Sequence, residues 1–204
     1  MKIYEYKGFP NPRRVRIFLA EKGINGIDFE QVDVPKGEHR QDFFLAKNPY
    51  GAVPTLELDD GTFISETVAI CRYFDERHPD RRLMGETPEE RAKIEMWQRR
   101  IEGSIFDPAA AYFHHATAGL GELESYQNDE WGRKNRDYLI AGMKKLDEAL
   151  AETEFVAGDE FSIADITGLC AVDYAAFVDI PIPGECANLQ RWYRAVSARP
   201  SATA

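Results

Sequence analysis

The sequence is poor in cysteine, and this shortage excludes two classes of protein. Its three cysteines, Cys71, Cys170 and Cys186, lie far apart, and no Cys-x-x-Cys pair or His/Cys metal-ligand spacing is present. We therefore expect neither a disulfide framework nor a bound metal. Free, scattered cysteines fit a reducing compartment, so we expect the protein to be cytoplasmic.

Basic residues are outnumbered by acidic ones, and long apolar runs are scarce. The formal net charge of -10 opposes binding to nucleic acid or to anionic membranes. No stretch approaches the roughly 20 apolar residues that a membrane-spanning helix needs. The first residues, 2–6, alternate like a strand and lack the pattern of a signal peptide. We expect a soluble protein without nucleic-acid or membrane partners.

The first part of the chain, residues 1–78, switches between strand and helix periodicity. Short alternating runs read as strands, and apolar residues at helical spacing separate them. The predicted order is β-α-β-α-β-β-α, which forms a mixed four-stranded sheet covered by helices. The segments are 2–6, 12–22, 29–34, 41–46, 53–58, 62–64 and a helix that opens at residues 65–67.

The second part of the chain has only helical periodicity. Residues 79–87 are polar and turn-rich and predict a linker, and residues 88–204 predict an all-helical bundle. Ser162 and Asp165 have the spacing of a helix capping box, for which we expect a structural role. The fold class is thus α/β followed by all-α.

The hairpin of residues 53–64 leads into a predicted helix start that suits an anion. Ser65, Glu66 and Thr67 open this helix, whose first backbone N–H groups have no partner within the helix. Together with the positive end of the helix dipole, they form a site for a carboxylate or a phosphate.

These motifs resemble those of the glutathione transferases, whose first domain is thioredoxin-like. The matching residues are Val53-Pro54 before the hairpin, Glu66-Thr67 after it, and the phrases 156–159 and 161–166 in the second half. The resemblance covers residues 1 to about 199. It implies a cis proline at Pro54, and a Val53 backbone that pairs with the cysteine residue of glutathione.

The same resemblance implies the other contacts with glutathione, which is the expected co-substrate. Glu66 would accept from the γ-glutamyl ammonium, and Thr67 would hold the γ-glutamyl carboxylate. His39 and Lys47 are candidates for the glycyl end. Ala52 departs from the family, because many relatives have Gln or Lys there.

The usual thiol-activating residue is missing. No serine, threonine or cysteine lies between Met1 and Pro54, and Phe9 and Pro10 stand near the place where serine-type relatives keep their hydroxyl. One alternative is Asn11, which reads as the N-cap of a helix whose first residue is Pro12; its amide and the helix dipole would stabilise the thiolate. A tyrosine, Tyr4 or Tyr6, is another, although we expect both to pack against neighbours.

The loop also resembles a fungal and bacterial subgroup without the usual residue, in which a water held by the second domain assists deprotonation. The corresponding segment here is 112–117. His114 is the first candidate to hold this water and His115 the second, because histidine accepts protons near neutral pH. The alternative interpretation is that both are ordinary surface or helix-end histidines. We rank Asn11 alongside the histidines.

The resemblance further implies a second, apolar substrate and a homodimer. Candidate contacts for a small activated electrophile are the aromatic residues Phe9, Phe106, Tyr112 and Phe113. The expected activity is conjugation of glutathione to hydrophobic electrophiles, as in detoxification. One alternative is a non-catalytic module that binds apolar ligands or a protein partner. A thiol reductase would need a cysteine in residues 9–12, and none is there.

Overall fold

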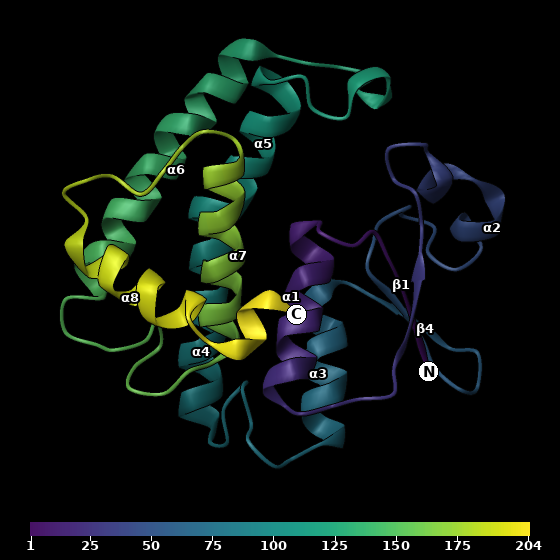
Figure 1. Cartoon of the computed structure of the whole chain (residues 1–204), viewed down its shortest axis with the longest axis horizontal. Helices are drawn as coiled ribbons and strands as arrows, with labels where there is room; N and C mark the ends of the chain where they lie inside the picture. Colours follow the sequence, from purple (N-terminus) through teal and green to yellow (C-terminus); the bar gives the residue numbers. More distant parts are fainter. The chain divides into compact units, whose positions relative to one another are not determined.

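The computed structural model describes residues 1–204, which divide into two compact units (Figure 1). The first unit comprises Met1–Arg81 and Thr203–Ala204, and the second comprises Arg82–Ala202. The division at residue 81 falls inside the segment 79–87 that we expected to be a linker.

The first unit contains a mixed four-stranded sheet with the strand order β2-β1-β3-β4. β1 and β2 are parallel, whereas β1 with β3 and β3 with β4 are antiparallel. This confirms the predicted thioredoxin-like arrangement. The strands are β1 (Lys2–Glu5), β2 (Asp28–Gln31), β3 (Thr55–Glu57) and β4 (Phe63–Ser65).

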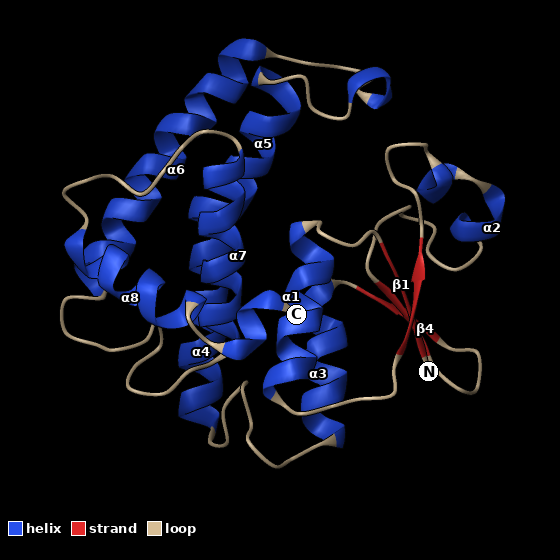
Figure 2. Ribbon diagram, in the orientation of Figure 1, coloured by secondary structure: helices blue, strands red, loops and turns tan.

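Helices cover both faces of this sheet, as Figure 2 shows. The longer helices α1 (Pro10–Glu21) and α3 (Thr67–Arg77) lie together on one face, and α2 (Asp42–Leu45), preceded by a 3-10 turn η1 (Glu38–Arg40), lies on the other. Side chains alternate along a strand, so neighbouring residues face opposite sides. The α2 side has its own apolar cluster of Tyr4, Val32 and Phe44.

The second unit is helical, as predicted. α5 and α6 pack along each other, and α7 contacts α4 (Figure 1). None of its helices is both long and apolar enough to cross a bilayer. The elements are α4 (Pro88–Ile101), a π-helical turn η2 (Glu102–Phe106), α5 (Asp107–Ala116), a 3-10 turn η3 (Gly121–Leu123), α6 (Asp129–Ala149), α7 (Ile163–Phe177), α8 (Ala187–Ser197) and a 3-10 turn η4 (Pro200–Thr203).

A π-helical turn, η2, separates α4 from α5, which follow each other without a loop. The N–H of Asp107 bonds to the carbonyl of Glu102, five residues back. Pro108 follows directly and has no N–H for the next helical bond. Gly142 of α6 approaches the Ser104 carbonyl so closely that a Cβ there would clash. The wider turn therefore coincides with a close helix crossing.

The capping box predicted at α7 is confirmed. The Ser162 hydroxyl accepts from the N–H of Ala164, and the Asp165 carboxylate accepts from the N–H of Ser162. Asp165 is fully buried and also accepts from the N–H of Val156 and from Nε1 of Trp192. Its carboxylate ties the turn before α7 to helix α8, which is a structural role.

Candidate functional site

Strand register places the Val53–Pro54 bond beside the start of α3. Thr55 pairs with Ser65, and Ser65 is followed directly by Glu66 and Thr67 at the start of α3. The Val53–Pro54 bond is cis, as the resemblance implies. No hydrogen bond within the chain engages the N–H or the C=O of Val53. The backbone there is open to pair with an extended ligand.

The start of α3 has no side chain that accepts a hydrogen bond from its first N–H groups. Glu66 is the N-cap and Thr67 the first helical residue, which lies within the expected start at residues 65–67. The first intrahelical bond runs from the N–H of Ile70 to the carbonyl of Glu66, and no side chain caps the helix. The N–H groups of Thr67, Val68 and Ala69 therefore remain available to an anion.

Glu66 has an unusual backbone for a residue with a side chain. Its φ is 70°, which is left-handed space that L-residues enter at a cost. Its side chain is exposed, whereas Thr67 is buried with 7% of its surface accessible. The strained turn sets an exposed carboxylate directly beside the free N–H groups of α3.

Two further candidates, His39 and Lys47, lie on the α2 side of the sheet. His39 is buried, and its Nδ1 has no hydrogen-bond partner. Burial, helped by Arg40, lowers the pKa of His39, so its imidazole is neutral near pH 7. The Lys47 ammonium lies over the ring of Tyr4, 5.2 Å from its centroid, and Val53 packs on the same Tyr4 cluster.

The structure corrects the expected cap of α1. The helix begins at Pro10 with Phe9 as its N-cap, so Asn11 sits in the first turn. The chain has two prolines that could start this helix, and the earlier one takes the favoured first position. The Asn11 carbonyl oxygen accepts from Nη1 of Arg14 at 3.1 Å. The same contact orients the amide so that its NH₂ group is free to donate.

The two nearby tyrosines pack against neighbours, as expected. The Tyr4 hydroxyl donates to Oε2 of Glu57 at 2.6 Å, and burial raises the pKa of this phenol. The Tyr6 ring packs edge-on against Phe9, with centroids 4.7 Å apart. Tyr4 is thus held as a neutral donor to a carboxylate, which excludes it as the group that activates a thiol.

His114 and His115 occupy the last turn of α5 and have different partners. Nδ1 of His114 lies 2.6 Å from Oε1 of Glu124, whereas Nδ1 of His115 accepts from the N–H of Asn128. Thr117 is the C-cap, and its hydroxyl donates to the Phe113 carbonyl. Both histidines are helix-end residues, but each belongs to a specific hydrogen-bond network.

Of the four aromatic residues predicted to contact the electrophile, two belong to one aromatic cluster and two do not. Phe106 and Phe113 both pack against Tyr174 of α7, with centroids 5.9 Å apart in each case. Phe177, which is 72% exposed, joins the Phe113 ring and completes this aromatic cluster. Tyr112 makes no ring contact in the cluster, and Phe9 belongs to the first unit. Sequence reasoning missed Tyr174 and Phe177.

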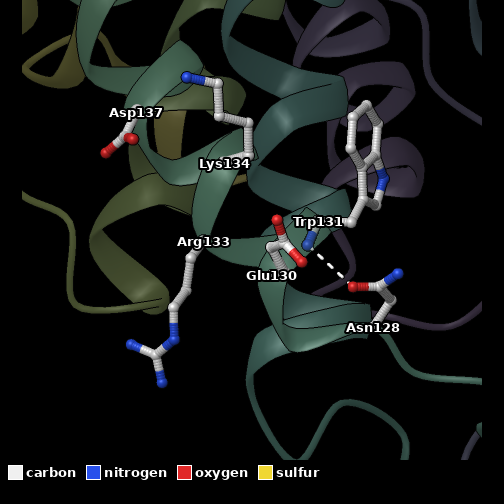
Figure 3. A pocket seen from close by; sticks show the side chains of 6 residues that line it. All are labelled: Asn128, Glu130, Trp131, Arg133, Lys134 and Asp137. Carbon is white, nitrogen blue, oxygen red and sulfur yellow. Dashed lines mark hydrogen bonds between the residues drawn. The ribbon is translucent and has the colours of Figure 1, made fainter.

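A surface pocket near the start of α6 contains none of the predicted catalytic or glutathione-binding residues (Figure 3). All its residues come from one helix or its cap, and the Asn128 oxygen accepts from the N–H of Trp131. The lining residues are Asn128, Glu130, Trp131, Arg133, Lys134 and Asp137. Nor does any group of three or more His, Cys, Asp or Glu side chains have the arrangement of a metal site.

Comparison with known proteins decides the family. Residues 3–82 match the glutathione S-transferase N-terminal domain, and residues 124–200 match the C-terminal domain. Glutathione S-transferase 2 of Saccharomyces cerevisiae is 47% identical over 98% of this chain and 87% of that protein. The chain belongs to the glutathione S-transferase family.

Solved structures of glutathione transferases have the same fold. The crystal structure of Gtt2 from Saccharomyces cerevisiae superposes with a TM-score of 0.97 at 47% identity, over 100% of this chain and 99% of that one. A class Gtt2 enzyme of Vibrio parahaemolyticus superposes with a TM-score of 0.86 at 36% identity, over 98% of this chain and 94% of that one.

Cysteine chemistry is not available to this glutathione transferase. Cys71, Cys170 and Cys186 are all buried, with at most 2% of their surface accessible. A thiol reductase needs an exposed, activated cysteine to form a mixed disulfide with glutathione. The structure therefore disfavours the reductase alternative.

Proposed function

We propose that this protein binds glutathione along Val53 and at the start of α3, and joins its sulfur to small hydrophobic electrophiles. One observation carries the proposal: an uncapped α3 N-terminus lies beside a backbone edge without hydrogen bonds. A tripeptide with a carboxylate at one end and a peptide backbone in its middle satisfies both features.

In the proposed pose of glutathione, each residue predicted to bind it contacts one part of the tripeptide. The γ-glutamyl carboxylate bonds to the N–H groups and hydroxyl at Thr67, and its ammonium donates to Glu66. The cysteinyl backbone pairs with Val53, beside Pro54. The Lys47 ammonium, which contacts aromatic rings, and the buried His39 are assigned to the glycyl end.

Asn11 is the proposed donor to the sulfur. A cysteine thiol has a pKa of about 8.5, and lowering it by two units needs about 2.7 kcal/mol of preferential thiolate stabilisation. A hydrogen bond to a charged group supplies about 1.5 to 3 kcal/mol. The N-terminus of α1 adds about 0.3 to 1 kcal/mol. The free NH₂ of Asn11 in the first turn of α1 supplies both.

His114 is the proposed acceptor of the thiol proton, through one water. His115 is less suited, because its Nδ1 already accepts from the N–H of Asn128. The thiolate then attacks an electrophilic carbon. It displaces halide from an aryl halide, or it opens an epoxide, whose released oxygen takes up a proton from water. The apolar electrophile is proposed to contact the predicted aromatic residues Phe9, Phe106, Tyr112 and Phe113.

We further propose a detoxifying role in the cytoplasm and a homodimer. The homodimer follows from family resemblance, and the large exposed apolar side chains of both units are the candidate contacts. They include Phe43 and Tyr50 in the first unit and Tyr126, Trp131 and Tyr138 in the second. Sedimentation equilibrium tests the dimer, and a monomer at micromolar concentration would contradict it.

Calorimetry and turnover together test the function. We expect saturable binding of glutathione by titration calorimetry, and conjugation to a generic aryl halide above the uncatalysed rate. Absence of glutathione binding would refute the proposal. Binding without turnover over a panel of electrophiles would favour the alternative, a non-catalytic module for apolar ligands or a protein partner. The lack of any serine, threonine or cysteine before Pro54 is the observation in favour of that alternative.

A further inference from the structure

The neighbouring histidines His114 and His115 have opposite hydrogen-bond roles. Nδ1 of His114 faces the Glu124 carboxylate at 2.6 Å, and Nδ1 of His115 faces the backbone N–H of Asn128 at 3.2 Å. One ring nitrogen therefore meets an acceptor and the other meets a donor. In a neutral imidazole one nitrogen carries the proton and the other a lone pair, so these contacts select the tautomer.

The carboxylate has no proton to share. Burial raises the pKa of Glu124, but the N–H of Leu120 and the contact with His114 outweigh burial, and the pKa is lowered overall. An ionised carboxylate only accepts, so Nδ1 of His114 must donate, and its lone pair is on Nε2. His115 has the reverse arrangement, with its lone pair on Nδ1.

The backbone of the loop after α5 holds the Glu124 carboxylate next to Nδ1 of His114. Oε1 of Glu124 also accepts from the N–H of Leu120 at 2.8 Å. Gly119 has a φ of 53°, and a Cβ at this position would clash with the Glu124 carboxylate. Gly121 has a φ of 65°, yet a Cβ there would meet nothing within 4 Å. Only one of the two glycines makes room for the carboxylate.

We propose that Glu124 is a positioning residue that holds His114 with Nε2 as the nitrogen that accepts the glutathione proton. The inference rests on the proposed function of this site. The proton leaves the sulfur through a water and arrives at Nε2, which gives a thiolate and an imidazolium beside a carboxylate. After conjugation the imidazolium returns this proton to solvent. A carboxylate that fixes an imidazole tautomer acts in this way in hydrolytic triads.

Nitrogen NMR of the histidines is the direct test. At a pH where the imidazoles are neutral, we expect the His114 Nε2 resonance at the position of an unprotonated nitrogen, and the reverse for His115. In Glu124→Ala and in Gly119→Ala, His114 should shift towards the Nε2–H form. Gly121→Ala is the matched control, since it replaces a positive-φ glycine of the same loop without touching the carboxylate, and it should leave the spectrum of His114 unchanged.

Kinetics connect the tautomer to the reaction. Acid–base groups contribute on the order of 10²- to 10⁴-fold to rates, so loss of the correct tautomer should lower kcat at least about tenfold. We expect this loss in Glu124→Ala and Gly119→Ala, with unchanged glutathione affinity. Glu124→Gln keeps a carbonyl acceptor for both donors and should recover part of kcat. His114→Ala combined with Glu124→Ala should be no slower than His114→Ala alone.

Two results would overturn the inference: an unchanged His114 tautomer in Glu124→Ala, or a changed tautomer with wild-type kcat. A thermal melt of each variant separates these results from unfolding, and Glu124→Gln retains the loop contact if the alanine variant is unstable. Wild-type protein that binds glutathione but turns over no electrophile marks failure of the proposed function instead, and this is visible before any variant is made.

Discussion

The helix N-termini of the two units differ in how their free N–H groups are satisfied. In the second unit, each long helix that begins after a loop has a side-chain acceptor in its first turn, and Thr87 and Ser162 belong to complete capping boxes. The acceptors are Thr87 for α4, Asn128 for α6, Ser162 for α7 and, from a neighbouring helix, Asp147 for the N–H of Leu189 in α8.

In the first unit, neither α1 nor α3 has such an acceptor. Phe9 and Glu66 stand at the two cap positions, and neither side chain accepts from its helix. Caps stabilise a helix by about 1 kcal/mol, whereas free N–H groups bind anions. The capped starts stabilise the helices of the second unit, and the three free N–H groups of α3 support its proposed role in ligand binding. The start of α1 offers only the N–H of Asn11, because Pro10 and Pro12 have none.

The largest expected effect is a loss of stability when the main hydrogen-bond acceptor at the start of α7 is removed. Asp165→Ala removes the acceptor of four buried donors: the N–H of Val156, the N–H and hydroxyl of Ser162, and Nε1 of Trp192. Each stranded group costs about 1 to 3 kcal/mol, so unfolding in urea should show a loss of more than about 3 kcal/mol. The exposed Asp159→Ala is the control, with a change within about 0.5 kcal/mol. Equal losses in both variants would contradict the role of Asp165.

Glu66→Ala should have the reverse profile. A hydrogen bond to a charged group contributes about 1.5 to 3 kcal/mol, so the Kd for glutathione should rise roughly 10- to 150-fold by calorimetry. The melting temperature should change little, because the side chain is exposed. Glu89→Ala, an exposed acid in the first turn of α4, should leave affinity unchanged. Wild-type affinity in Glu66→Ala would place the γ-glutamyl ammonium elsewhere.

A pair of hydroxyl deletions sharpens the comparison. Ser162→Ala removes a cap and should cost about 1 kcal/mol of unfolding free energy without changing glutathione affinity. Thr67→Ala should weaken glutathione about 2- to 10-fold, with a smaller effect on stability, and Thr67→Ser should restore binding. If both variants altered stability alone, the α3 start would be an ordinary helix end.

The smallest expected effect is a change in how stability depends on acidic pH. The Glu90 carboxylate accepts from the N–H groups of Glu86 and Thr87, and these bonds lower its pKa below the ordinary 4.5. A lowered pKa stabilises the folded state above pH 4.5, and this contribution is lost as pH falls through the folded value. Glu90→Gln should therefore show a slightly smaller drop in melting temperature on acidification. An identical acid response would contradict the contribution of this box.

The sequence allowed the order of elements and the cap of α7 to be predicted, because both depend on local patterns. It did not settle where α1 begins, since Pro10 and Pro12 both fit a helix start. The π-helical turn had one local signal, Pro108, which has no N–H for a helical bond, and its partner Gly142 lies on another helix.

Two parts of the proposed site had no usable signal in the sequence. Tyr174 and Phe177 lie on α7, which is apolar on nearly all sides, so periodicity does not indicate which side they face. Glu124 is one of two acids in the loop between α5 and α6, and its contact with His114 depends on how that loop folds back onto α5. Residues joined by tertiary contacts of this kind escape reasoning from spacing.

The central claim is that the γ-glutamyl head of glutathione binds the free N–H groups of α3, and amide NMR tests it most directly. Titration with glutathione should shift the amides of Thr67, Val68 and Ala69 and leave those at the start of α7 unmoved. Cysteinylglycine, which lacks the γ-glutamyl group, should not shift the α3 amides. Saturable glutathione binding that leaves these three amides unmoved would contradict the claim.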